Sequence, residues 1–475
     1  MIFAQQTGST DTGSAGGPGR IWRRADQAAG GLAADLTLYT LSATFAVITA
    51  ATSTLLPHRA WGAVAAVGYL AAALAVTGQL LARRLSPASL TCGTAARATL
   101  TAVTWAGTAL LPLVWQSVQR AGGHPDRAQE EVVVVEESGA RLLDHGTPYL
   151  GRDAIGALPL DERLLGYNPY QPGMALFGLP RALAGAGWWT DARIWFALAT
   201  SAALLLAVSA LRRGASRHPA GGTGPARRDA ALVRALQLAT VLPVCALTLA
   251  TGGDDLPVLA LCLLALALCA ARRPGAAGLA IGAAAALKLF AWPVVPVLLV
   301  YAAARGRGVL VRLASGALGL PLAALLPPLL ADPAALVENV LRFPLGQGIV
   351  TSPAQSPFPG HLIASGLPAG RAVAAALLVA AGLAIAVQLA RRPPGTAAAT
   401  AMICGYGLLV AILLMPSTRF GYLLYPIALL AWIPALRPAE AAPPTGPESP
   451  TGPPAPTDDA APRDPAPIDT PTPAA

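Results

Sequence analysis

Charged side chains are scarce in this 475-residue chain, because Asp, Glu, Lys and Arg make up only 12% of it while hydrophobic residues make up 54%. Ordinary soluble domains carry about 25% charged residues. The mean hydropathy is positive, which points the same way. The composition therefore excludes an ordinary soluble globular domain and indicates a polytopic membrane protein.

Cysteine is also scarce, and lysine is nearly absent, since Lys288 is the single lysine among 33 basic residues. The cysteines lie in or beside apolar runs and show neither metal-ligand spacing nor a pair across one loop; they are Cys92, Cys245, Cys262, Cys269 and Cys404. This argues against a disulfide scaffold and a structural metal site. The first thirty residues have no apolar core followed by a cleavage site, so we expect no removable signal peptide.

Apolar runs close to the roughly 20 residues that a helix needs to cross a bilayer recur along most of the chain. We expect ten crossings, at residues 32–56, 61–82, 95–115, 192–211, 231–250, 256–271, 309–330, 372–390, 397–415 and 420–436. The run at residues 275–304 differs, because Lys288, Pro293 and Pro296 interrupt it. We expect a hairpin of two half-helices there, hinged near Lys288, in an all-α transmembrane bundle over residues 31–436.

Arginine pairs orient these segments, because short cytoplasmic loops hold the excess of basic residues. All of them fall on one side if the N-terminus is cytoplasmic: Arg23/Arg24, Arg83/Arg84, Arg212/Arg213, Arg227/Arg228, Arg272/Arg273, Arg305/Arg307 and Arg391/Arg392. Both ends of this multi-pass cell-membrane protein are then cytoplasmic. The polar residues 1–30 and the Pro/Ala-rich residues 437–475 are expected to be disordered there. The net charge of +9 then reflects topology and an anionic inner leaflet, and it does not indicate nucleic-acid binding.

The long loop at residues 116–191 faces the outer side in this topology. It holds ten of the 24 acids, namely Asp126, Glu130, Glu131, Glu136, Glu137, Asp144, Asp153, Asp161, Glu162 and Asp191. Solvation of an exposed loop is the simple explanation for any one of them. Aromatic and turn residues lie among the acids, and "MALFGLPRALAGAGWW" suits an amphipathic helix in the membrane interface.

Several motifs in and after this loop resemble one enzyme family. Glu131 stands eleven residues before Leu142 of the "LL" pair, and Gly146, Pro148 and Tyr149 follow. The next motif is "YNPYQPGMALFGLP". After it come the "TGGDD" turn, its helix and a Gly-rich half-helix that ends in "KLF", and then "STRFGYLLYP". Over residues 114–434 the chain resembles the polyprenol-phosphate-mannose-dependent glycosyltransferases of family 87 in the GT-C superfamily. That family more often has Asp where Glu131 stands.

The resemblance implies a GT-C bundle with a long first catalytic outer loop carrying amphipathic helices. It also implies transfer of a sugar, expected to be mannose, from a polyprenyl-phosphate donor to a lipid or glycan acceptor at the outer face. Such a transfer with inversion needs one carboxylate base, and the departing phosphate needs cationic or hydrogen-bonding partners.

Candidate site residues follow from the resemblance together with this chemistry and topology. Glu131 is the first candidate base and Glu136 the second; on a helix, five residues turn the chain by about 140°, so only one of them faces the cleft. We expect Lys288 to bind the donor phosphate, because intramembrane charges are functional candidates. Arg419, in an outer turn after Pro416, is the second expected phosphate ligand. Substrate positioning is expected of Asp254, Asp255, Tyr149 and Tyr167.

Each candidate also has a simpler explanation. Lys288 would snorkel or pair with an acid, the Asp pair would cap a helix, and Arg419 would anchor at the interface. His124, His145 and His361 are isolated, so we expect no metal site and no cofactor, with divalent-metal dependence left open.

Two other classes of protein stay open. A transporter or lipid flippase also uses broken helices, although no second broken run suggests an inverted repeat. A non-catalytic protein of the same fold is the other alternative.

Overall fold

The computed structural model describes residues 28–86, 90–217 and 225–437, which belong to one compact unit, Met1–Ala441. Apart from one isolated bridge between Gln355 and Thr418, these residues form helices, turns and loops. The expected all-α transmembrane bundle is confirmed. Residues 1–27 and 438–475, which include most of the two expected disordered tails and the Arg23/Arg24 pair, lie outside the described residues.

Seven helical segments of the described chain are long and apolar enough to cross a membrane. They are built from α2 Leu32–Thr52 (preceded by η1 Ala28–Gly31), α3 Leu56–Leu85, α4 Thr94–Trp105 with η3 Ala106–Leu110 and α5 Leu111–Ala121, α9 Ala192–Arg217, α15 Arg307–Ala331, α18 Gly370–Arg391 and α19 Ala397–Leu414. An eighth span results if α10 Pro225–Thr240 and α11 Pro243–Thr251, bent by 47°, count as one.

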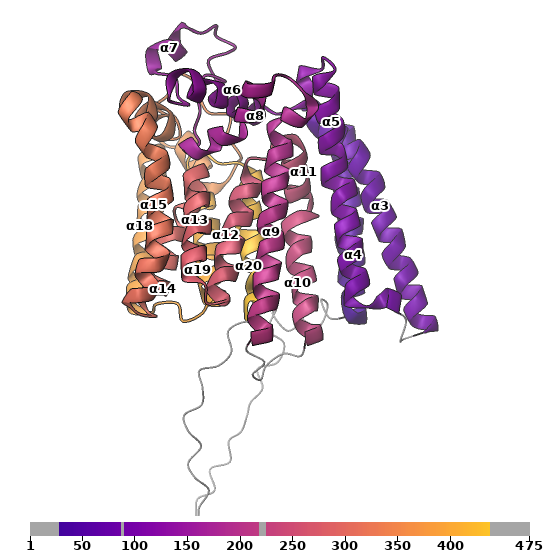
Figure 1. Cartoon of the computed structure of the whole chain (residues 1–475). Coiled ribbons are helices and arrows are strands. Elements are labelled where there is room, and N and C mark those ends of the chain that lie inside the picture. Colours follow the sequence, from indigo (N-terminus) through magenta and orange to yellow (C-terminus); the bar gives the residue numbers. More distant parts are fainter. Residues whose placement is uncertain (1–27, 87–89, 218–224, 438–475) are drawn as a thin grey trace, which may run out of the picture. The chain divides into compact units, whose positions relative to one another are not determined.

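Shorter apolar helices complete the bundle (Figure 1). These are α12 Asp255–Ala270, α13 Pro274–Leu287, α14 Val294–Ala303 and α20 Leu424–Leu436. The count of ten crossings was too high, because α12 and α20 have 16 and 13 residues. At about 1.5 Å per residue, neither covers about 30 Å of hydrocarbon. α12 is buried on nearly every side, so neighbouring helices surround it and its length need not match the bilayer.

Prolines shape two of the spans. Pro112 in α5 has no N–H, so it leaves the carbonyl of Thr108 in the π-helical turn η3 without its usual helical donor. The indole N–H of Trp61 donates to that carbonyl at 2.7 Å and joins α3 to η3. Pro243 begins α11 after the bend, and the Tyr69 hydroxyl donates to the free carbonyl of Val241 at 2.5 Å.

The interrupted run at residues 275–304 forms α13, the short η7 Leu289–Ala291, and α14, with an extended backbone at Lys288 between α13 and η7. α13 packs directly on α15 through small residues, because a β-carbon on Gly278 or Gly282 would collide with the α15 backbone. The carbonyl of Leu287 at the end of α13 accepts from the Gln171 N–H at 3.1 Å. The loop at residues 116–191 therefore covers the break in this helix.

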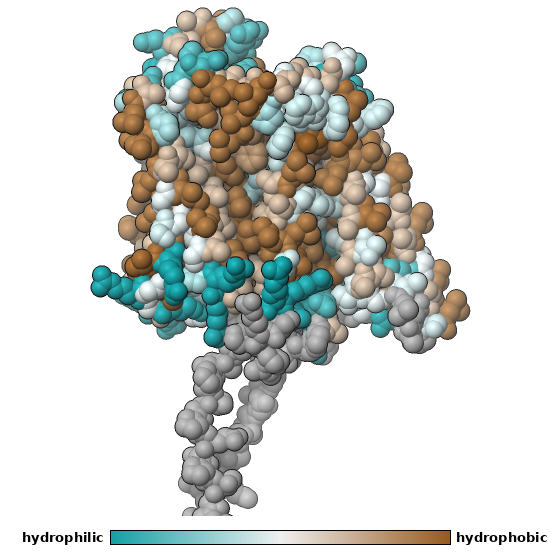
Figure 2. Space-filling model, in the orientation of Figure 1, coloured by the Kyte–Doolittle hydropathy of each residue, from teal (hydrophilic) through white to brown (hydrophobic). Residues whose placement is uncertain are grey.

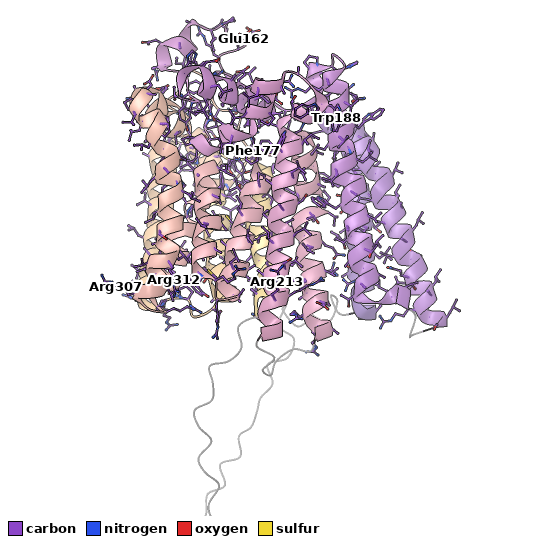
Figure 3. The ribbon with its side chains drawn as sticks, viewed as in Figure 1. Glu162, Phe177, Trp188, Arg213, Arg307 and Arg312 are labelled. Carbon is purple, nitrogen blue, oxygen red and sulfur yellow. The ribbon has the colours of Figure 1, made fainter. Side chains whose placement is uncertain are left out.

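Hydrophilic residues gather at both ends of the bundle, and hydrophobic residues predominate between them (Figure 2). Arg213, Arg307 and Arg312 lie at one end, and Glu162 and Trp188 lie at the other (Figure 3). The second end carries α6 Glu130–His145, α7 Arg152–Ala157 and α8 Leu179–Ala184 (Figure 1). The remaining short elements are η2 Leu90–Cys92, η4 Pro125–Arg127, η5 Pro172–Phe177, η6 Trp188–Thr190, α16 Pro333–Val337, η8 Glu338–Arg342, α17 Pro359–Gly366 and η9 Phe420–Leu423.

Candidate active site

The acidic stretch of the outer loop forms α6, and Glu131 lies in its first turn. The carboxylate of Glu131 pairs with the Nη1 group of Arg419, 288 residues further along the chain. Arg419 follows Thr418, whose backbone exchanges hydrogen bonds with Ala354 and Ser356 at 2.9 Å each. Two backbone segments from different parts of the chain therefore hold Arg419 beside the start of α6.

Arg419 has donors to spare. Of its guanidinium groups, only Nη1 donates to a described residue, and its side chain is 37% exposed. A guanidinium carries five N–H donors in a planar fork that matches phosphate oxygens. The remaining donors of Arg419 can therefore receive an anionic group next to the Glu131 carboxylate.

Lys288 lies at the break between α13 and η7 and pairs with two carboxylates. Its Nζ atom donates to Asp254 Oδ2 at 2.5 Å and to Asp255 Oδ1 at 2.6 Å, and all three side chains are less than a tenth exposed. Asp254 precedes α12 but accepts no hydrogen bond from its backbone, so it does not act as the expected helix cap. The three residues, which we call the Lys288 triad, carry a formal net charge of −1 with both aspartates ionised.

Tyrosine rings surround the Lys288 triad. The rings of Tyr170 and Tyr422 have their centroids 5.2 and 5.4 Å from the Lys288 Nζ atom. The Tyr425 hydroxyl donates to Asp255 Oδ1 at 2.7 Å, and its ring stacks on Phe290 with a centroid separation of 5.2 Å. These aromatic residues replace solvent around the charges on several sides.

Tyr170 connects the triad with Glu131. Burial raises the pKa of its phenol well above the usual value, and the nearby carboxylates of Asp254 and Glu131 raise this pKa further. The charges of the Lys288 triad and of Glu131 thus both act on Tyr170. We therefore treat Glu131, Arg419 and the Lys288 triad as one polar cluster.

Glu136, the second candidate base, is already fully engaged. Arg120 donates to both of its carboxylate oxygens at 2.7 Å, Arg181 approaches to 3.1 Å, and the Ala192 N–H donates at 3.1 Å. Burial disfavours the charged form of neighbouring Asp191, but Arg193 and Arg120 outweigh it and lower its pKa to about 2. This network ties α6 to α5 and α9, which is a structural arrangement.

Tyr149 and Tyr167 are buried away from direct contact with the Lys288 triad. The Tyr149 hydroxyl donates to the Tyr170 carbonyl at 2.8 Å. The Tyr167 hydroxyl donates to Glu338 at 2.9 Å and accepts from the Ile349 N–H at 2.7 Å, and its ring stacks on Phe343. These contacts anchor the loop. Tyr149 is joined to Tyr170, and Tyr167 is joined to Glu338 and Phe343.

The described residues contain no group of three or more His, Cys, Asp or Glu side chains arranged to hold a metal ion. All five cysteines are buried free thiols. His124 is exposed and its Nδ1 lies 3.3 Å from the Gln119 carbonyl, while His361 Nδ1 lies 3.0 Å from the Pro416 carbonyl.

Residues 168–416 match the model of glycosyltransferase family 87, which is more than half of the chain. The chain belongs to glycosyltransferase family 87. The match confirms the family that the sequence motifs resemble. It includes the Lys288 triad, whereas Glu131, Glu136, Tyr149, Tyr167 and Arg419 lie outside it.

Among solved structures, this family 87 chain is similar to the crystal structure of ArnT from Cupriavidus metallidurans in the apo state. The two share 19% identity with a TM-score of 0.39, over 65% of this chain and 54% of that chain. The chain thus spans about half the length of that protein. The comparison with curated proteins found no match.

Sequence reasoning missed the three tyrosines around the triad, although two of the quoted motifs contain them: "YNPYQPGMALFGLP" holds Tyr170, and "STRFGYLLYP" holds Tyr422 and Tyr425. Their aromatic and proline-rich setting was the available signal. Gln129, two residues before Glu131, and His58, whose Nε2 lies 2.8 Å from Gln129 Nε2, carry no signal in the sequence alone.

Proposed function

We propose that this family 87 protein transfers mannose from a polyprenyl-phosphate donor to a hydroxyl of a lipid or glycan acceptor, with inversion at the anomeric carbon. The observation that carries the proposal is the pairing of Glu131 with Arg419. It supports a base and a phosphate ligand at one place, at the end of an apolar bundle where a lipid-linked donor is accessible.

Glu131 is the proposed general base. The acceptor oxygen forms a bond to the anomeric carbon, the bond between that carbon and the phosphate oxygen breaks, and the hydroxyl proton passes to the carboxylate. Polyprenyl phosphate leaves with the bonding electron pair. The spare donors of Arg419 stabilise the negative charge on the departing phosphate.

Arg419 also controls access to the base in this proposal. In the structure its guanidinium holds the Glu131 carboxylate, which is then less available to an acceptor hydroxyl. A bound phosphate competes for the same guanidinium and loosens that pair. The donor therefore prepares the base before the acceptor reacts.

Lys288 has a different role from the expected phosphate ligand. Because two carboxylates already neutralise it, the triad has a net charge of −1 and repels a phosphate. We propose that Lys288 holds Asp254 and Asp255 in place, where their other oxygen atoms accept hydrogen bonds from sugar or acceptor hydroxyls. Tyr149 and Tyr167 position the substrate indirectly, through the loop that they anchor.

The orientation is part of the proposal. The arginine-rich end faces the cytoplasm by the excess of basic residues in inner loops, and the end with α6 faces outward. The polyprenyl tail lies in the bilayer, and the sugar phosphate reaches the cluster from the outer leaflet.

Membranes containing the protein, incubated with radiolabelled polyprenyl-phosphate mannose, test the reaction. We expect label to pass to a lipid or glycan acceptor, and NMR of the product to show the anomeric configuration opposite to that of the donor. Matched reactions with polyprenyl-phosphate glucose test the sugar. A product that keeps the anomeric configuration of the donor contradicts the proposal. So does the absence of transfer from any lipid-linked sugar.

A further inference from the structure

We propose that Gln129, held by His58 and Thr251, is a positioning residue for the base. The three residues, called here the Gln129 clamp, fix the start of α6 and with it the Glu131 side chain two residues later. The inference rests on the proposed function, because it assumes that Glu131 takes the acceptor proton.

The backbone of Gln129 joins two helices. Its N–H donates to the carbonyl of Thr251, the last residue of α11, at 3.0 Å. Its own carbonyl accepts from the Val132 N–H at 3.1 Å in the first turn of α6. The end of α11 therefore fixes the position of the first residues of α6.

The side chain of Gln129 completes the clamp. The Thr251 hydroxyl lies within hydrogen-bond distance of two acceptors, Gln129 Oε1 at 3.0 Å and the Leu247 carbonyl at 2.9 Å, and its one proton serves both. Gln129 Nε2 lies 2.8 Å from His58 Nε2. Because the amide oxygen faces the hydroxyl, the amide nitrogen is the donor to His58.

The space around the amide is also matched to it. A β-carbon on Gly252 would lie 2.9 Å from Gln129 Oε1, which is too close for the amide to keep its place. Thr251 itself has no exposed surface. The absence of a β-carbon at Gly252 thus leaves the space that the Gln129 amide occupies.

The clamp lies close to the base. Glu131 follows Gln129 by two residues and lies in the first turn of α6. Glu131 belongs to the same first helical turn as the Gln129 carbonyl contact, so a shift of Gln129 displaces its carboxylate. A displacement of about 1 Å in a catalytic group can lower turnover by about 100-fold.

Thr251→Val tests the clamp, because it keeps the shape of the side chain and removes the hydroxyl. We expect kcat to fall by about 10- to 100-fold, with the KM for polyprenyl-phosphate mannose unchanged. Thr251→Ser, which keeps the hydroxyl, recovers most of that loss, and Gly252→Ala reproduces it by displacing the amide. The matched control is Thr248→Val, since the Thr248 hydroxyl donates only to Val244 in its own helix.

Combination with Glu131→Gln distinguishes positioning from a general loss of structure. If Thr251 acts through the base, Thr251→Val adds nothing to the loss already caused by Glu131→Gln. The same fold-loss in both backgrounds overturns the positioning role, and so does full turnover in Thr251→Val while Glu131→Gln is impaired. Wild-type turnover in Glu131→Gln contradicts the proposed base instead, whatever Thr251→Val does.

Discussion

Replacement of Lys288 by Met tests the Lys288 triad, because it removes the cation and nearly preserves the volume of the side chain. The Nζ atom holds Asp254 and Asp255 at 2.5 and 2.6 Å, and all three side chains are less than a tenth exposed. Without the ammonium group the net charge of the site changes from −1 to −2, with two carboxylates adjacent in the sequence. Removing one partner from a buried ion pair costs about 3–5 kcal/mol.

We therefore expect Lys288→Met to lower the free energy of unfolding by about 3–5 kcal/mol, measured by titration with a denaturing detergent. The matched control is the triple variant with Asp254→Asn and Asp255→Asn, which contains no charge at the site. It should recover most of the lost stability, because replacing a whole buried ion pair by neutral groups is often tolerated.

The opposite result would support the role that the sequence predicts for Lys288. If Lys288→Met unfolds at the wild-type free energy and only the KM for the donor rises, then the ammonium group binds the phosphate and does not stabilise the fold. The reasoning from the charge of the triad would then be refuted.

Three further predictions concern the outer loop. Glu136→Gln should cost about 3–5 kcal/mol in unfolding, since it leaves Arg120 with one fewer buried carboxylate. Glu137→Gln, at a partly exposed helical pair, should cost about 1 kcal/mol or less, and equal losses contradict the network. Because Asp191 has a folded pKa of about 2, its stabilisation is complete above about pH 4 and is lost as the pH falls through about 2. Asp191→Asn should flatten the acid limb of the unfolding curve, and an unchanged limb contradicts the assignment. A cysteine at Gly151 should react with an impermeant reagent in intact cells; reaction only after permeabilisation would reverse the orientation.

The spanning helices were largely predictable because hydropathy and length decide them locally. All seven segments that meet the spanning criteria overlap expected crossings. α12 and α20 were wrongly expected to be full-length crossings. A helix surrounded by other helices is as apolar as one in lipid but need not be as long. Only the packed neighbours distinguish the two cases.

The candidate site was predictable in its residue types and much less in its pairing. The acidic loop, Lys288 and Arg419 all stood out as charges in an apolar chain. Their partners depend on tertiary structure, because Glu131 meets Arg419 across 288 residues and Lys288 meets Asp254 across 34. Local sequence could not indicate that Glu136 would be enclosed by arginines, because these come from α5 and from the segment before α9.

The rate of a single turnover in Glu131→Gln tests the central claim most directly, with donor bound at saturation and Glu130→Gln as the neighbouring control. Gln keeps the shape of the side chain and a hydrogen-bond acceptor for Arg419, but its neutral amide cannot take the acceptor proton. The account predicts that the rate of sugar transfer falls by about 100-fold or more in Glu131→Gln, with donor affinity little changed and Glu130→Gln close to wild type. A wild-type rate in Glu131→Gln would contradict it.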